Sequence, residues 1–229
     1  MARPAFIFCD TDAVIQFLLT GEVRPFRVLR SNYSIQPLVV PEVEIELRSN
    51  QRFGARIAPE LKRALEHNLL RVVDKSVLEA HYGSSLGASM AATAALGQIA
   101  SVGRQNLARA DSGEAYTHAA ALTMGVPSMS NDITALKTLV AAGLPVPATV
   151  LRPFDLISLC FQVNEMTEHD CDQFRATLIK ENEHVPSCFL HASFGDGLTN
   201  FVPRICDLRH AAVGATGGPS LPYSTVVDL

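Results

Sequence analysis

Several acidic side chains stand where short apolar runs end or where helices are expected to begin. Asp10 and Asp12 follow the first apolar run of the chain, AFIFC, and Asp132 follows a later run. Asp111 and Glu114 open a helical segment one turn apart. Carboxylates that crowd together raise one another's pKa, so such a cluster is tolerated chiefly when a divalent cation lies in it. Oxygen-only ligands favour Mg²⁺ or Mn²⁺, ions suited to hydrolysis of a phosphodiester.

Each of these acids also has a structural interpretation. Asp12 and Asp111 stand where they could cap a helix N-terminus, a role that needs no metal. Three glutamates, Glu42, Glu44 and Glu46, share the segment PEVEIELRSNQRF, and at least two of them are expected to be ordinary surface charges. The pattern alone does not choose among the three.

Basic residues follow this glutamate segment. Arg48, Arg52 and Arg56 recur at four-residue spacing. If one helix carries them, at least Arg48 and Arg52 lie on the same side, where they could bind phosphates flanking the acidic centre. The alternative is a solvated helix face.

His118 lies one helical turn after Glu114. On the same face of a helix it could contact substrate or hydrogen-bond an acid. The alternative is a packed side chain whose hydrogen bonds are satisfied inside the core.

Strands and helices must alternate to bring these residues together. The expected strands cover residues 5–9, 37–40, 69–73, 126–129 and 147–151, with helical segments between them. This alternation predicts an α/β fold, a three-layer, Rossmann-like parallel sheet flanked by helices, with ligands at the carboxyl ends of the strands. We expect the helix that begins at Pro41 to end near Gly54 and to turn Val43, Leu47 and Ile45 inward.

Length and composition limit the possible classes of protein. The chain has 229 residues, of which 48% are hydrophobic, so it can bury a large core and is not disordered. Its net charge of -4 argues against a general polycation that coats nucleic acid. Its five cysteines form no CxxC pair, which argues against a zinc ribbon or a disulfide framework. No apolar run is long enough for a membrane span, so we expect a cytoplasmic protein with no membrane contact.

Four segments resemble the successive signature segments of the PIN-domain family, most of whose members are metal-dependent ribonucleases. They are FIFCDTDAVIQFLL, VVPEVEIELRS, DSGEAYTHAAALTMGVPSMSND and the following ITALKTL. The resemblance covers about residues 5–150. It implies a PIN-like nuclease domain over residues 1–152. The helical pattern after Pro153 predicts a helical extension over residues 153–213 packed on the same domain, and the Gly- and Pro-containing sequence GATGGPSLP predicts a flexible tail over residues 214–229.

The resemblance also implies the site and its partners. It assigns catalysis and metal binding to the acids Asp10, Glu46, Glu114 and Asp132. Asp12 and Asp111 are further candidate metal ligands, and Mg²⁺ or Mn²⁺ is the expected cofactor. The expected substrate is RNA, and Arg48 and Arg52 are the candidate substrate-binding residues. A role as the toxin of a toxin–antitoxin pair, with an antitoxin protein as partner, is one biological setting that the resemblance implies. The apolar faces of the extension are expected to cover the sheet or to form a homodimer interface.

Two other classes of function remain open. A strand followed by Asp10-x-Asp12 also opens the haloacid dehalogenase-type phosphatases, in which the first Asp is the nucleophile. The later Lys and paired-Asp motifs of those enzymes cannot be placed here. A non-catalytic PIN-like binding module is the other alternative, against which the presence of all four matching acids weighs.

Overall fold

A parallel sheet organises the molecule. The computed structural model describes residues 5–73, 112–124, 126–131, 147 and 149–201. Its strands are β1 (Ala5–Cys9), β2 (Ile35–Val39), β3 (Arg71–Val72), β4 (Ser128–Met129) and β5 (Val150–Leu151). They form a five-stranded sheet in the order β3-β2-β1-β4-β5, and every pair is parallel. The α/β prediction is therefore confirmed, with β1 at the centre.

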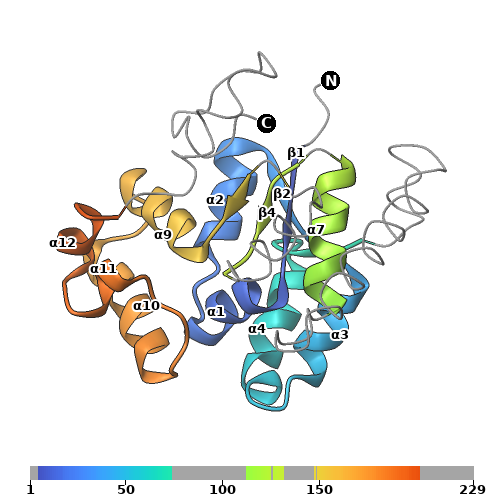
Figure 1. The fold of residues 1–229 in the computed structure, drawn as a ribbon, viewed down its shortest axis with the longest axis horizontal. Helices are drawn as coiled ribbons and strands as arrows, with labels where there is room; N and C mark the ends of the chain where they lie inside the picture. Colours follow the sequence, from blue (N-terminus) through green and yellow to red (C-terminus); the bar gives the residue numbers. More distant parts are fainter. Residues whose placement is uncertain (1–4, 74–111, 125, 132–146, 148, 202–229) are drawn as a thin grey trace, which may run out of the picture.

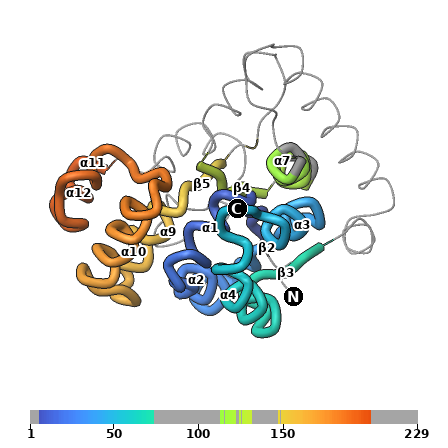
Figure 2. The backbone as a smooth tube through the Cα atoms, turned by 90° about the horizontal axis from the view of Figure 1, so that it is seen from below, coloured from blue at the N-terminus to red at the C-terminus, as the bar shows by residue number. Residues whose placement is uncertain are grey.

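Helices cover both sides of this sheet and extend beyond it. They are α1 (Thr11–Thr20), α2 (Arg24–Tyr33), α3 (Pro41–Ser49), α4 (Gly54–Glu66), α7 (Ser112–Met124), α9 (Pro153–Gln162), α10 (Glu168–Lys180), α11 (Ser187–Leu190) and α12 (Phe194–Leu198). Figure 2 shows α7 on one side of the sheet and α1, α2 and α4 on the other. The arrangement is the three-layer, Rossmann-like one expected from the sequence.

The first βα unit follows directly from local sequence. Ile7, Phe8 and Cys9 of β1 are buried, which covers both faces of the strand, as is typical of a central parallel strand. Asp10 caps α1, and Gly21 ends it with a φ of 70°. That left-handed conformation is easiest for glycine, which has no Cβ. The sharp turn at Gly21 allows α2 to begin within three residues.

The prediction of one helix from Pro41 to about Gly54 is wrong. Helix α3 ends at Ser49, and Gly54 begins α4. The side chain of Asn50 accepts hydrogen bonds from the backbone N–H groups of Arg52 (3.0 Å) and Phe53 (2.8 Å), which stabilises a turn in place of further helix. At Gly54 a Cβ would lie 3.2 Å from the carbonyl oxygen of Arg48, so a residue without a side chain allows the turn to close tightly.

Ile45 was also placed wrongly. Val43 and Leu47 are buried as expected, but Ile45 is 65% exposed. Helical geometry puts Val43, Glu46 and Leu47 on one face and turns Ile45 away from it. This face of α3 packs against α7.

The extension after β5 is helical, as predicted. At the start of α9 the Asp155 carboxylate accepts a hydrogen bond of 2.7 Å from the backbone N–H of Arg152, and at the start of α10 Thr167 and Asp170 form a reciprocal cap. Helix α9 packs on α1 and α2, and α10 packs on α1. Figure 1 shows these helices beside α1 and α2.

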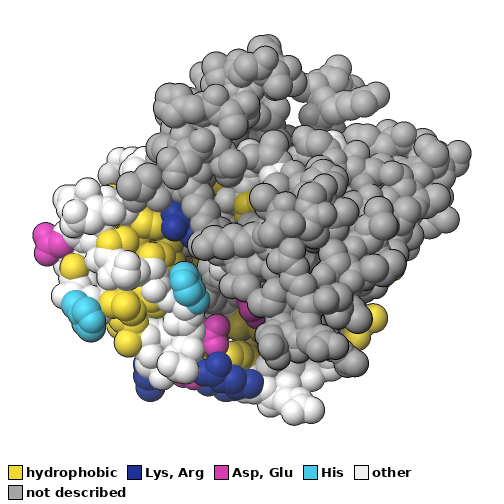
Figure 3. Space-filling model, viewed as in Figure 1, with side chains coloured by type: hydrophobic (Ala, Val, Ile, Leu, Met, Phe, Trp, Pro, Cys, Tyr) yellow, Lys and Arg dark blue, Asp and Glu magenta, His cyan; other side chains and the backbone are white. Residues whose placement is uncertain are grey.

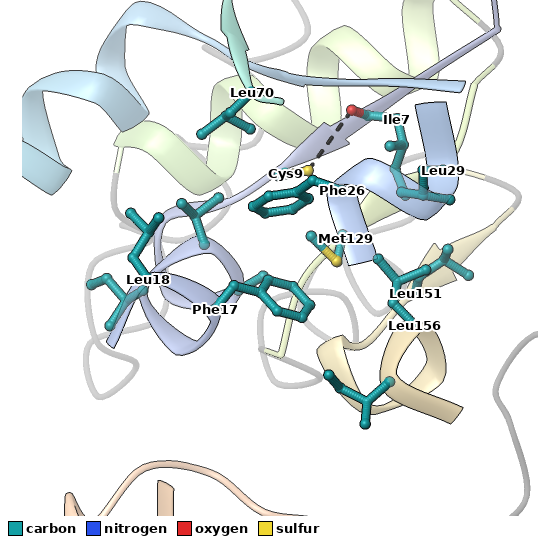
Figure 4. Close-up of a cluster of buried hydrophobic side chains, with 14 of the residues drawn as sticks. Ile7, Cys9, Phe17, Leu18, Phe26, Leu29, Leu70, Met129, Leu151 and Leu156 are labelled. Atoms are coloured by element: carbon teal, nitrogen blue, oxygen red, sulfur yellow. Dashed lines mark hydrogen bonds between the residues drawn. The ribbon is translucent and has the colours of Figure 1, made fainter. Parts of the chain in front are cut away.

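One hydrophobic cluster joins the sheet domain to this extension. Phe17 of α1 lies 5.8 Å from Phe174 of α10 between ring centroids, and Phe154 of α9 lies 5.5 Å from Phe174. Figure 4 shows the part of the cluster beneath β1 and β4, where Phe17 and Met129 point toward each other. The extension therefore shares its core with the sheet.

The buried thiols belong to this core. Burial raises the pKa of Cys9 and Cys160 above the usual range for a thiol and raises that of Cys171 to about 12. These thiols stay protonated at neutral pH, which makes them poor nucleophiles.

The surface of the described part is mixed in character. Over α10–α12, apolar, acidic, basic and histidine side chains are interspersed (Figure 3). Within the described ranges, none of the helices has both the length and the apolar character required to cross a membrane.

Candidate functional site

The candidate site lies where the order of the strands reverses. Chain connections lead from β1 to β2 in one direction, whereas β4 lies on the other side of β1. In open parallel sheets, the crevice outside the carboxyl ends of two such strands is the usual place for a ligand. Asp10 follows β1 there, and Ser130 and Asn131 follow β4.

Asp10 is the most buried acid at this edge. Its side chain is 3% exposed, and its Oδ1 accepts a hydrogen bond of 2.8 Å from the backbone N–H of Ala13. The prediction that Asp12 could cap α1 is wrong, because Asp10 is the cap. A second hydrogen bond comes from the side chain of Ser130. The carboxylate is therefore fixed between α1 and the end of β4.

The surroundings of Asp10 disfavour its charge. Burial is the largest cause, and it raises the pKa of Asp10 to about 7. The negative charges of Glu114 and Asp12 raise this pKa further, whereas the hydrogen bonds from Ser130 and Ala13 lower it. The carboxylates of Glu114 on α7 and Asp12 on α1 thus lie close enough to Asp10 to disfavour its charge.

Glu46 connects the beginnings of two helices. Its Oε2 accepts a hydrogen bond from the hydroxyl of Thr11, the first residue of α1. Its Oε1 accepts one of 2.8 Å from the backbone N–H of Gly113, the second residue of α7. A Cβ at Gly113 would lie 2.3 Å from Glu46 Oε2, so the contact requires glycine. The N-termini of α1 and α7, each with a partial positive charge, therefore meet at this carboxylate.

Glu114 and His118 lie one turn apart on α7. His118 is 4% exposed, and its Nε2 lies 3.6 Å from Glu114 Oε1. Its Nδ1 lies 3.2 Å from the hydroxyl of Ser128 on β4. His118 has features of both interpretations: its ring is packed in the interior and hydrogen-bonded to Ser128, and its Nε2 lies close to an acid without being within hydrogen-bond distance of it.

Two more buried polar atoms lie at this edge. Within the described ranges, Thr117 Oγ1 on α7 and Asn131 Nδ2 after β4 have no hydrogen-bond partner. Buried groups of this kind are costly unless water or a ligand satisfies them.

The structure brings only some of the predicted acids together. The charges of Glu114 and Asp12 each act on Asp10, and Asp12 stands exposed in the first turn of α1. Glu46 joins them at the N-termini of α1 and α7. Asp111 and Asp132 lie outside the described residues.

Arg48 and Arg52 do not share a helix face, contrary to the prediction. Arg48 lies on α3, where its Nη2 is 2.7 Å from Glu44 Oε1, and Arg52 lies in the turn before α4. The Arg52 Nη1 is 2.9 Å from Glu183 Oε1. The helix break at Asn50 separates the two arginines.

Glu183 is a neighbour of the site that sequence reasoning missed. It follows α10, and its pKa is raised first by burial, whereas Arg52 lowers it and the charge of Asp12 raises it. It is 131 residues from Arg52 along the chain, so no local pattern could have found this contact. The nearby pair of Arg56 Nη1 and Glu181 Oε2, 2.7 Å apart, links the same two regions.

The side chains at the site offer the type of donor atom that a hard divalent cation prefers. The nearby acids offer carboxylate oxygens only, and Mg²⁺ is commonly held by one or two carboxylates together with waters. Within the described ranges, no group of three or more His, Cys, Asp or Glu side chains is arranged to hold a metal ion. The buried Asp10, with its raised pKa near Glu114, is the observation that fits a cation, since a cation would favour both charges.

Comparisons with known protein families, with curated proteins and with solved structures find no match to this chain. The resemblance to PIN domains therefore stays a prediction that rests on the four sequence segments alone.

Proposed function

We propose that this protein is a nuclease that hydrolyses RNA phosphodiester bonds with the aid of Mg²⁺ or Mn²⁺. The observation that carries the proposal is the burial of Asp10 at the strand-order reversal, where the charges of Glu114 and Asp12 act on it and its pKa is raised to about 7. Such crowding of acids is costly without a cation to offset it. The choice of RNA among phosphodiesters rests on the PIN-like segments.

Different residues of the chain would bind the cation and hold the surrounding elements in place. Asp10 and Glu114 would hold the cation, which when bound stabilises the negative charge that develops on phosphodiester oxygens. The hydrogen bonds from Ala13 and Ser130 fix the Asp10 carboxylate in one orientation. Glu46 accepts hydrogen bonds from the first turns of α1 and α7 and so fixes these two helix ends relative to each other beside Asp10.

Cleavage assays with one removed carboxylate test the proposal. The wild type and Asp10→Asn would be incubated with mixed-sequence single-stranded RNA in Mg²⁺, Mn²⁺ or EDTA. We expect cleavage by the wild type with either ion, none in EDTA, and a loss of at least a hundredfold in Asp10→Asn. Asp196→Asn on α12 removes an acid from the extension and should cleave like the wild type.

An assay with p-nitrophenyl phosphate, a generic phosphomonoester, distinguishes the proposed nuclease from a phosphatase and from a binding module. Release of phosphate without RNA cleavage would favour the phosphatase that uses Asp10 and Asp12. RNA binding without either reaction would favour a binding module. Equal RNA cleavage by the wild type and Asp10→Asn would contradict the proposed site.

A further inference from the structure

A series of contacts between buried polar side chains connects α7 to the end of the sheet. Ser128 and Ser130 are two residues apart on β4 and its continuation, so their side chains point to the same face of the sheet. Ser128 contacts His118, His118 contacts Glu114, the charge of Glu114 acts on Asp10, and Asp10 accepts a hydrogen bond from Ser130. This series of contacts therefore starts at Ser128 on β4 and ends at Ser130, directly after β4.

The surroundings of His118 would suit an apolar side chain. The residues that follow it on α7, Ala119, Ala120 and Ala121, are buried. A buried imidazole costs free energy unless its nitrogens have polar partners. Ser128 supplies one partner and Glu114 lies at the other nitrogen, so the ring has a fixed orientation.

The distances indicate how the ring is held. A separation of 3.2 Å between Nδ1 and the Ser128 hydroxyl is a hydrogen bond, whereas 3.6 Å between Nε2 and Glu114 Oε1 is an electrostatic contact. If the Ser128 hydroxyl donates to Nδ1, the ring proton is on Nε2 and faces the carboxylate of Glu114. Repulsion from Asp10 would otherwise turn that carboxylate away.

We propose that His118 is a positioning residue: anchored by Ser128, it holds the Glu114 carboxylate toward Asp10 in the orientation needed to bind a divalent cation. This inference rests on the proposed function. Partners that orient metal-ligating side chains from behind typically change metal affinity ten- to a hundredfold when they are removed.

Two amide substitutions separate positioning from simple packing. The amide nitrogen of Gln in His118→Gln can take the place of Nε2 and face Glu114, whereas the shorter amide in His118→Asn reaches only the place of Nδ1 and faces Ser128. The probe is Mn²⁺ alone, titrated calorimetrically into the full-length protein. We expect His118→Asn to weaken Mn²⁺ binding ten- to a hundredfold and His118→Gln to retain affinity within about threefold of the wild type.

Thermal unfolding in EDTA reports separately on folding. If His118 had a purely structural role, the Mn²⁺ affinity of each variant would follow its thermal stability. The two variants would then not differ in the way expected above, with His118→Gln retaining affinity and His118→Asn losing it. If His118→Asn does not fold, Ser128→Ala removes the anchor with less disturbance and should weaken Mn²⁺ binding at least threefold.

The possible failures are distinct. Equal Mn²⁺ affinity in the wild type and in every folded variant would overturn the positioning role and leave the proposed function intact. A wild type that binds no Mn²⁺ at millimolar concentration would overturn the proposed function, and the positioning role with it.

Discussion

Asp10 carries two roles whose requirements conflict. As the cap of α1 it accepts a hydrogen bond from Ala13, and the capping contact is strongest when the carboxylate is ionised. Burial and the charges of Glu114 and Asp12 oppose ionisation and raise its pKa to about 7. Since the unfolded chain has an Asp pKa near 3.9, the folded protein holds a proton that the unfolded protein releases between about pH 4 and 7. Stability without metal therefore falls as the pH rises through this range.

The variant Asp10→Asn should remove this pH dependence. Asn keeps an oxygen for Ala13 and has no charge, so we expect the variant to exceed the wild type in free energy of unfolding at pH 7.5 in EDTA, by up to about 4 kcal/mol. At pH 4 the two should be nearly equal. Urea unfolding across this pH range measures the difference. A constant difference at every pH would contradict the raised pKa.

Asp170 provides a control of opposite sign. Its hydrogen bonds with Arg24 and Thr167 lower its pKa, so it stabilises the fold above its unfolded pKa and loses this effect as the pH falls. Asp170→Asn should therefore destabilise the protein at neutral pH.

At the scale of elements, Glu46 explains why Gly113 is glycine. In Gly113→Ala, the new methyl group would displace the Glu46 carboxylate and break its hydrogen bond with the N-terminus of α7. We expect a loss of about 1–2 kcal/mol in the free energy of unfolding.

The effect of Gly113→Ala on the free energy of unfolding should change sign when Glu46 is absent. In a Glu46→Ala background there is no carboxylate to displace, and Ala is a better helix former than Gly, so Gly113→Ala should stabilise by up to about 1 kcal/mol. A double-mutant cycle by urea unfolding measures this coupling. Additive effects of the two substitutions would show that the contact contributes nothing.

Arg48 and Arg52, which follow Glu46 in the sequence and lie on separate elements, are predicted to bind phosphates of the RNA. Arg48 and Arg52 are both more than half exposed. We expect the variant Arg48→Ala/Arg52→Ala to bind single-stranded RNA more weakly and to reduce the slope of log K against log salt by about 1.4, which is about 0.7 for each phosphate contact. Filter binding over a salt series measures the slope.

The control removes two charges from the C-terminal half of α4. Lys62→Ala/Arg63→Ala changes the net charge equally, but these side chains lie at the opposite end of α4 from the turn that holds Arg52. If both double variants had the same slope, general charge rather than specific phosphate contact would explain RNA binding.

Local patterns predicted those parts of the site that lie on one element. The apolar run of β1 followed at once by Asp10 predicted a strand with an acid at its carboxyl end, although not that this acid would be buried. Glu46 was chosen by resemblance, although its helical spacing from Val43 and Leu47 already placed it on the inner face of α3. The break at Asn50 was missed because it depends on a side-chain amide that competes with the helix. Glu183 was missed because its contacts form only when distant segments fold together.

At the scale of the whole molecule, the extension and the sheet domain depend on each other. Arg52 and Arg56 bridge the start of α4 to the segment after α10, and Gln16 of α1 donates a hydrogen bond of 3.1 Å to the carbonyl of His184. The aromatic contacts of Phe174 with Phe17 and Phe154 bury the interface between them. Such apolar contacts contribute far more than the exposed ion pairs.

A single substitution measures this dependence in the intact chain. Phe174→Ala should lower the free energy of unfolding by about 3–5 kcal/mol, because it leaves a cavity between α1, α9 and α10. Ile179→Ala on the same helix is the matched control: its side chain is 40% exposed, so the loss should stay below about 1 kcal/mol. Both values come from urea unfolding followed by circular dichroism.

Truncation after Arg152 tests the domain prediction directly. The fragment 1–152 would keep the whole sheet but expose Phe17 and the surfaces of α1 and α2 that α9 and α10 cover. We expect it to aggregate or to unfold without a cooperative transition, since exposed apolar surface of this kind is a liability in a soluble chain. A chain ending after Ala211 keeps α9–α12 and should unfold in a single transition. If the fragment 1–152 were soluble and unfolded cooperatively, the extension would be an independent module, and the Arg52–Glu183 and Arg56–Glu181 pairs would join two domains rather than two parts of one.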